Sequence, residues 1–197
     1  MKANARILDA TAGNKTMWKK NESNKIMWID VEEELEHEPD FIMDCTKTDF
    51  EDGRFHTIFF DPPHEWGRKK YSNIFTIPNR THPSYKKYKL GGGDTYYGWD
   101  KYATKGKLLE FVSNAQTEFY RLLSDDGCLW VKWNEWKINV KEIIPLFLNW
   151  DLMMRTYGTP PRQESQTKTY WLLFLKKEGG LQTSFRSSCQ TVKRDDS

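Results

Sequence analysis

Short apolar runs alternate with longer polar or amphipathic stretches along this chain. Seven runs have the length and the aromatic or β-branched content of buried strands. They cover residues 6–11, 25–30, 41–44, 55–61, 128–133, 151–157 and 169–175. Apolar residues recur at helical spacing over about 106–123, and a shorter helix is expected over 140–149. Strands that alternate with helices predict an α/β domain built on a βαβ-type sheet.

The connections between these elements differ in length and composition. The first two are short and polar, so any helix near residues 16–21 or 31–38 must be small. Pro62 and Pro63 end the fourth strand because proline has no backbone N–H to donate. A long insertion without clear periodicity follows over residues 65–105, and the Gly-, Ser- and Thr-rich tail 178–197 is expected to be disordered.

The composition suits one soluble domain of 197 residues. Aromatic residues make up 15% of the chain, and rings at that density need a core, which argues against general disorder. No apolar run reaches the roughly 18–20 residues of a membrane helix, and the first residues do not form a signal peptide. Cys45, Cys128 and Cys189 have neither metal-site nor disulfide spacing, so we expect a cytoplasmic protein without a metal.

The insertion combines positive charge with aromatic rings. It holds nine Lys or Arg residues against three acidic residues, together with nine aromatic residues. Rings that stack on bases, interleaved with cations for phosphates, are typical of proteins that bind single-stranded or flipped-out bases. The candidate substrate-binding residues are Trp66, Arg68, Lys69, Lys70, Tyr71, Tyr96, Tyr97 and Trp99. Glycines 91–93 would serve as a hinge for a lid; alternatively, the segment is a solvated flap whose rings pack on the sheet.

Four consecutive predicted strands carry an aspartate at their carboxyl ends, namely Asp9, Asp30, Asp44 and Asp61. Ligands of parallel sheets bind at this edge. The turn after the first strand has one glycine, Gly13, and lacks both a phosphate-binding loop and the three glycines of a dinucleotide fold. This argues against NAD and ATP. A carboxylate so close to the ligand suits a cationic group instead.

The sequence Asp61-Pro62-Pro63-His64 follows the fourth strand directly. Two prolines with fixed φ hold the turn rigid, so the Asp61 carboxylate and the next carbonyls point outward. A rigid group of acceptors beside a ring can hold an –NH₂ group on a planar base. The alternative is a strand exit that is rigid and nothing more.

These residues resemble the class I S-adenosylmethionine-dependent methyltransferases, in particular the amino-methyltransferases of DNA and RNA, over roughly residues 5–177. The resemblance implies one Rossmann-like domain over residues 1–177, whose seventh strand lies antiparallel between the fifth and the sixth. It implies that S-adenosylmethionine contacts Asp9, Ala10, Thr11, Ala12 and Gly13 with its methionine part, Asp30 with its ribose, and Val31, Asp44 and Cys45 with its adenine. It makes Asp61, Pro62, Pro63 and His64 the catalytic loop.

Two positions depart from the family pattern. Lys15 stands where the first loop usually has a second glycine, and His64 stands where the catalytic loop usually has Tyr, Phe or Trp. The resemblance implies methyl transfer to an exocyclic amine of a nucleic-acid base, with adenine favoured. Two alternatives stay open: a catalytically silent, nucleic-acid-binding subunit of a two-chain enzyme, and a methyltransferase for protein or small-molecule amines. A homodimer or heterodimer is compatible with each.

Overall fold

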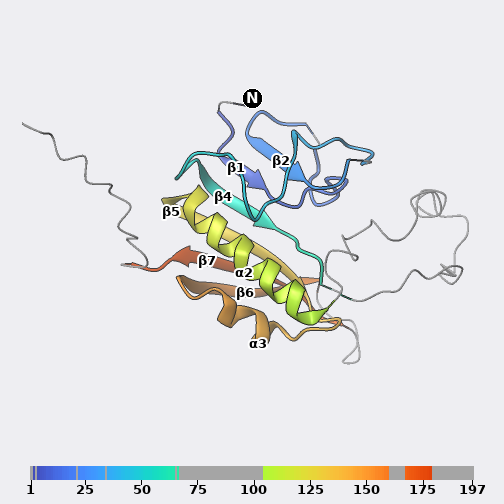
Figure 1. The fold of residues 1–197 in the computed structure, drawn as a ribbon, viewed down its shortest axis with the longest axis vertical. Coiled ribbons are helices and arrows are strands. Elements are labelled where there is room, and N and C mark those ends of the chain that lie inside the picture. Colours follow the sequence, from blue (N-terminus) through green and yellow to red (C-terminus); the bar gives the residue numbers. More distant parts are fainter. Residues whose placement is uncertain are drawn as a thin grey trace, which may run out of the picture.

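The computed structural model describes residues 2, 4–20, 22–33, 35–64, 66, 104–159 and 167–178. In this part of the chain one seven-stranded sheet forms the body of the molecule (Figure 1). Its strands are β1 (Ile7–Asp9), β2 (Ile26–Asp30), β3 (Phe41–Ile42), β4 (Phe55–Phe60), β5 (Leu123–Asn134), β6 (Trp150–Thr159) and β7 (Thr169–Lys176).

The strand order is β3-β2-β1-β4-β5-β7-β6. Strands β1 to β5 pair with one another in parallel, whereas β7 is antiparallel to both β5 and β6. The predicted α/β fold, a mostly parallel seven-stranded sheet with an antiparallel seventh strand between the fifth and the sixth, is confirmed.

Each strand differs from its predicted bounds, by one or two residues at an end except at the start of β5. Strand β5 begins at Leu123 rather than at the predicted residue 128, because an irregularity in the register between Phe55 and Thr57 lets Leu123 pair with Phe55. Strand β3 ends at Ile42 rather than at Asp44. Asp44 instead accepts hydrogen bonds from the backbone N–H and the hydroxyl of Thr46, at 2.9 and 2.7 Å, which turns the chain away from the sheet.

Helix α2 (Lys105–Leu122) matches the predicted helix and begins at Thr104, whose hydroxyl accepts the Lys107 N–H. The helix predicted over 140–149 is wrong in part. It is a four-residue helix, α3 (Val140–Ile143), followed by a 3-10 turn, η1 (Ile144–Leu146). Pro145 lacks the N–H that would continue an α-helical ladder. No helix is present among the described residues of the first two connections.

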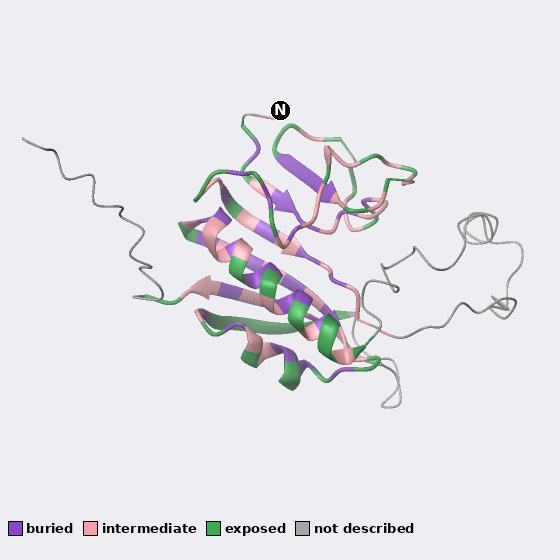
Figure 2. Cartoon of the chain, in the orientation of Figure 1, coloured by how far each residue is buried: buried purple, intermediate pink, exposed green. Residues whose placement is uncertain are grey.

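The helices cover one face of the sheet. Helix α2 lies in front of the sheet in Figure 1 and runs along β4 and β5, and its buried positions, purple in Figure 2, face these strands. The main core on this face contains Ile58, Phe60, Leu108, Phe119 and Phe174, all at most 1% exposed. On the opposite face a smaller cluster of Ala12, Ile26 and Trp28 lies beneath the loop that follows β1.

Farther along that opposite face, alternate residues of β4, β5 and β7 are half-buried. Phe59 stacks on Trp130 at 6.4 Å between ring centroids, and Trp171 meets both rings edge-on. These rings lie beside each other because Phe59 pairs with Trp130 across β4 and β5. The aromatic row therefore crosses β4, β5 and β7 on this face.

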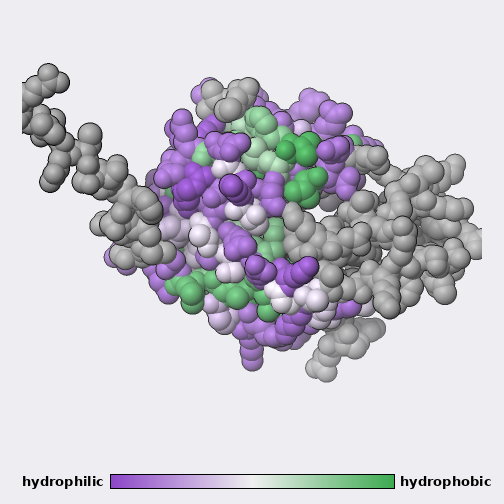
Figure 3. All heavy atoms as spheres, in the orientation of Figure 1, coloured by the Kyte–Doolittle hydropathy of each residue, from purple (hydrophilic) through white to green (hydrophobic). Residues whose placement is uncertain are grey.

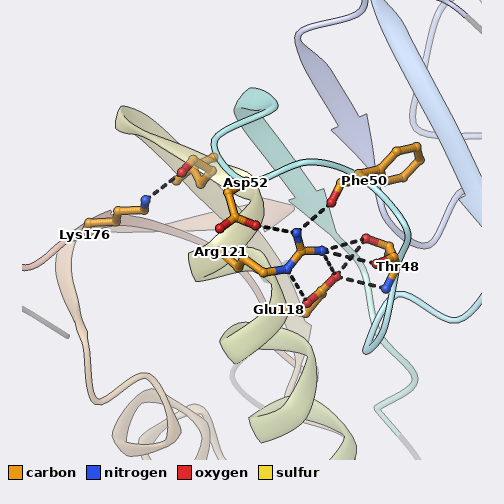
Figure 4. Close-up of polar contacts among 7 residues, drawn as sticks. Thr48, Phe50, Asp52, Glu118, Arg121 and Lys176 are labelled. Carbon is orange, nitrogen blue, oxygen red and sulfur yellow. Dashed lines mark hydrogen bonds and ion pairs between the residues drawn. The ribbon is translucent and has the colours of Figure 1, made fainter. Parts of the chain in front are cut away.

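Arg121 fastens the end of α2 to the segment between β3 and β4 (Figure 4). Its guanidinium donates to the Phe50 carbonyl at 2.6 Å, to Asp52 at 2.7 Å and to Glu118 at 2.6 Å. Glu118 also accepts the N–H and the hydroxyl of Thr48. Burial alone would raise the pKa of Glu118, but the hydrogen bonds from Arg121 and Thr48 outweigh it and lower that pKa.

Hydrophilic residues predominate on the face that Figure 3 shows, and hydrophobic side chains gather in two smaller areas of it.

Strand β6 differs from the rest of the sheet, since residues 151–158 are all exposed. None of the helices in the described ranges is long and apolar enough to span a membrane.

Candidate functional site

The carboxyl ends of β1, β2 and β4 bring three carboxylates together. Asp9 ends β1, Asp30 ends β2, and Asp61 follows β4. Asp9 is paired with Phe59 of β4, so Asp61 lies two residues beyond its neighbour. Asp9 is only 1% exposed. Burial raises its pKa to about 6, hydrogen bonds from Trp18 and Thr11 oppose this, and repulsion by Asp61 and Asp30 adds to it.

The loop after β1 is closed by its own hydrogen bonds. Asp9 accepts the Trp18 indole N–H at 2.6 Å and the Thr11 N–H at 3.3 Å. The Gly13 N–H donates to Asp30 at 2.8 Å, which ties this loop to the end of β2. Gly13 has a φ of +49°, and a Cβ placed on it would meet nothing within 4 Å. The glycine is therefore needed for its backbone conformation, and the space beside it is open.

Lys15 adopts the backbone conformation of a glycine. Its φ is +56°, in the left-handed region, where a side chain costs about 1–2 kcal/mol. The side chain is buried, donates to the Glu38 carbonyl at 2.7 Å, and places its ammonium 4.6 Å from the centre of the Trp28 ring. A lysine thus takes the left-handed conformation at the position where the family loop usually has its second glycine, and its side chain packs on Trp28 of β2.

The remaining predicted cofactor residues lie along the same edge. Asp30 accepts backbone N–H groups on both oxygens, from Gly13 and from Glu32. Val31 follows it and is 51% exposed. Asp44 binds Thr46, and Cys45 is buried in the main core. Ala10 and Ala12 are also buried, so these two hold the loop in place through their packing.

The segment Asp61-Pro62-Pro63-His64 leaves β4 at the same edge. The Asp61 N–H donates to the Thr11 hydroxyl at 2.8 Å, which joins this segment directly to the loop after β1. Pro62 is buried, whereas Pro63 and His64 are half-buried. The Asp61 carboxylate accepts the Lys132 ammonium at 2.6 Å, and both side chains are about one-third exposed. A rigid and partly exposed carboxylate therefore lies next to the loop that contains Gly13.

Two residues of this site were not predicted from the sequence. Trp18 donates to Asp9, and Lys132 pairs with Asp61. The alternation within β5 gives a signal for Lys132, because Trp133 next to it is fully buried, which places Lys132 on the opposite face. Trp18 falls in a polar connection with no periodic pattern, so it offered no such signal.

The predicted substrate-binding residues lie mostly beyond the described part of the chain. Trp66 is described; it is half-buried, packs against the main core, and has the Lys137 ammonium 5.5 Å from its ring centre. Arg68, Lys69, Lys70, Tyr71, Tyr96, Tyr97 and Trp99 lie outside the described residues. The described residues contain no group of three or more His, Cys, Asp or Glu side chains that could hold a metal ion.

No protein-family profile matches the sequence, and no curated protein sequence matches it either. Solved structures do match the fold. A TehB-like SAM-dependent methyltransferase from Corynebacterium glutamicum has a TM-score of 0.51 at 12% identity, covering 88% of this chain and 81% of that chain. The 1,6-didemethyltoxoflavin-N1-methyltransferase of Burkholderia thailandensis, solved with S-adenosylhomocysteine, has a TM-score of 0.50 at 12% identity, covering 87% and 71%.

A third similar structure has a different activity in its name. The cyclase SpnF has a TM-score of 0.52 at 10% identity, covering 88% of this chain and 76% of that chain. At such low identities the likeness concerns the fold alone. The chain has the fold of the SAM-dependent methyltransferases, and its reaction depends on the residues at the carboxyl edge of its own sheet.

Proposed function

We propose that this protein transfers the methyl group of S-adenosylmethionine to an exocyclic amino group of a nucleic-acid base, with adenine the first candidate. The fold supports the cofactor, since two of the similar structures are methyltransferases by name and one of them was solved with S-adenosylhomocysteine. The observation that carries the proposal is the Asp61 carboxylate, fixed beside the loop that contains Gly13.

The residues at this edge fit the cofactor. Space is open beside Gly13, and Asp9 is repelled by two neighbouring carboxylates, so a cationic group here would relieve that repulsion. When bound, S-adenosylmethionine supplies an electrophilic methyl group on a sulfonium. The loop from Asp9 to Gly13 would hold its methionine part. Asp30 and Val31, together with Asp44 and Cys45, would hold its nucleoside part.

The catalytic loop would position the acceptor. Asp61 accepts one hydrogen of the amine, the Pro62 carbonyl accepts the other, and His64 stacks on the base. This arrangement leaves the nitrogen lone pair free for attack. Because a sulfonium is a good leaving group, orientation of the amine is most of what the protein has to contribute. A nucleic-acid acceptor is supported by the cationic and aromatic composition of residues 65–105.

The test has two stages. Calorimetric titration with S-adenosylhomocysteine should give micromolar affinity that Asp30→Ala weakens. Labelled S-adenosylmethionine should then methylate pools of single-stranded RNA or DNA, and Asp61→Ala should lower the rate at least 100-fold with the cofactor affinity unchanged, because alanine has no oxygen that could accept the amine hydrogen. Asp125→Asn, an exposed carboxylate on β5, is the matched control and should keep full activity.

Each failure identifies a different alternative. Cofactor binding without nucleic-acid methylation would contradict the acceptor and favour a protein or small-molecule amine. A folded protein that binds nucleic acid but no cofactor would contradict the enzyme altogether and favour the silent subunit of a two-chain methyltransferase.

A further inference from the structure

Strand register places Lys132 beside the candidate catalytic aspartate. Phe60 of β4 pairs with Val131 of β5, so the next residue on each strand is Asp61 and Lys132. The Lys132 ammonium lies 2.6 Å from Asp61 Oδ2. This contact follows from the sheet itself rather than from a flexible loop, because both residues directly continue hydrogen-bonded strands.

The surroundings of Asp61 favour such a partner. Asp61 and Asp9 repel each other, and Asp9 itself lies close to Asp30. An ammonium next to Asp61 offsets this repulsion and holds the carboxylate in one rotamer. The hydrogen bond from the Asp61 N–H to the Thr11 hydroxyl fixes only the backbone of Asp61 and cannot orient its side chain. Among the described residues no donor is bonded to Asp61 Oδ1, so one oxygen is held and the other can accept a further hydrogen bond.

We propose that Lys132 is a positioning residue that holds Asp61 by Oδ2 and directs Oδ1 toward the amino group of the acceptor. This inference rests on the proposed function. Lys132 acts through Asp61 and makes no contact with the methyl group. Removal of the Lys132 ammonium should therefore slow methyl transfer without weakening the binding of the cofactor.

The test compares three variants of the full chain. Lys132→Met keeps the length of the side chain and removes the charge, whereas Lys132→Arg keeps the charge. Lys176→Met removes the lysine of another ion pair, with Asp125, which lies away from the carboxyl ends of the parallel strands. The readouts are kcat and KM with a nucleic-acid acceptor, and the Kd of S-adenosylhomocysteine.

We expect Lys132→Met to lower kcat by 10- to 100-fold, with KM for the acceptor changed less than threefold and the Kd of S-adenosylhomocysteine less than twofold. Lys132→Arg should restore at least a third of the wild-type kcat, and Lys176→Met should leave kcat unchanged. An unchanged kcat in Lys132→Met would overturn the inference. So would a tenfold loss of cofactor affinity, because Lys132 would then bind the cofactor instead.

A second measurement separates this inference from the proposed function. The melting temperatures of Lys132→Met, Asp61→Asn and the double variant form a thermodynamic cycle that needs no acceptor. If the ion pair holds Asp61, the double variant should lose less than the sum of the two single losses. Additive losses overturn the inference even if the wild type is active. If the wild type methylates no amine but the losses in the cycle are less than additive, the proposed function is refuted and the Asp61–Lys132 ion pair is still supported.

Discussion

Asp9 gives the sharpest prediction, because its burial links the stability of the fold to pH. The pKa of this carboxyl is raised from its usual value of 3.8 to about 6, first by burial and then by Asp61 and Asp30, against the hydrogen bonds from Trp18 and Thr11. A group whose pKa is raised on folding binds its proton more tightly in the native state. Between these two values the native state therefore holds more protons, and stability falls as the pH rises.

The size of the effect follows from the two values. The difference between 3.8 and about 6 corresponds to about 3 kcal/mol at 25 °C, of which about 2 kcal/mol falls between pH 4.5 and pH 7.5. Asp9→Asn removes the titration and adds a constant cost, because one of the two donors to Asp9 meets an amide N–H. The pH dependence of the difference between wild type and variant therefore isolates Asp9.

The assay is urea unfolding of both proteins without cofactor at pH 4.5, 5.5, 6.5 and 7.5. The free energy of unfolding of the wild type minus that of Asp9→Asn should decrease by about 2 kcal/mol across this range. Asp125→Asn, at an exposed carboxylate, should show no such trend. A difference that stays constant within about 0.5 kcal/mol, or that increases with pH, would refute the reasoning, because 0.5 kcal/mol is a quarter of the expected change.

Three further predictions concern contacts described above. Arg121→Met should lower the free energy of unfolding by about 2 kcal/mol at pH 7, because it leaves Glu118 partly buried without its cation. Since folding lowers the pKa of Glu118, this loss of stability should shrink as the pH falls below about 4.5, and urea unfolding at several pH values measures it. Gly127→Ala should cost about 1–3 kcal/mol in thermal melts, since its Cβ would lie 2.8 Å from the His56 carbonyl oxygen; an unchanged melting temperature would contradict the packing. Thr11→Val removes the acceptor of the Asp61 N–H, and the loss of this hydrogen bond should cost about 1–2 kcal/mol of stability. It should lower kcat by a larger factor than it lowers the affinity for S-adenosylhomocysteine measured by calorimetry.

The sheet could be predicted from the sequence because its strands are short apolar runs bounded by turn residues. Asp9, Asp30 and Asp61 could be predicted as neighbours for the same reason, since parallel strands place their carboxyl ends at one edge. The break in the helix after β5 depends on Pro145 and could have been anticipated.

Other features depend on distances that a sequence does not contain. Lys132 is 71 residues from Asp61, and their contact requires the register of β4 on β5. The conformation of Lys15 is equally hidden, because a lysine at positive φ contradicts local preference and is stabilised by Trp28 and the Glu38 carbonyl. Tertiary contacts outweigh local preference at that position.

The position of β7 between β5 and β6 has a consequence for the growing chain on the ribosome. Among the described strands, β6 pairs with β7 alone, and β5 pairs with β4 along one edge and with β7 along the other. Since β7 follows both β5 and β6 in the sequence, a chain that pauses before Thr169 presents an unpaired edge on each of these two strands. Such a chain can pair with others of its kind, so the speed of synthesis over these residues should influence how much protein reaches the native state.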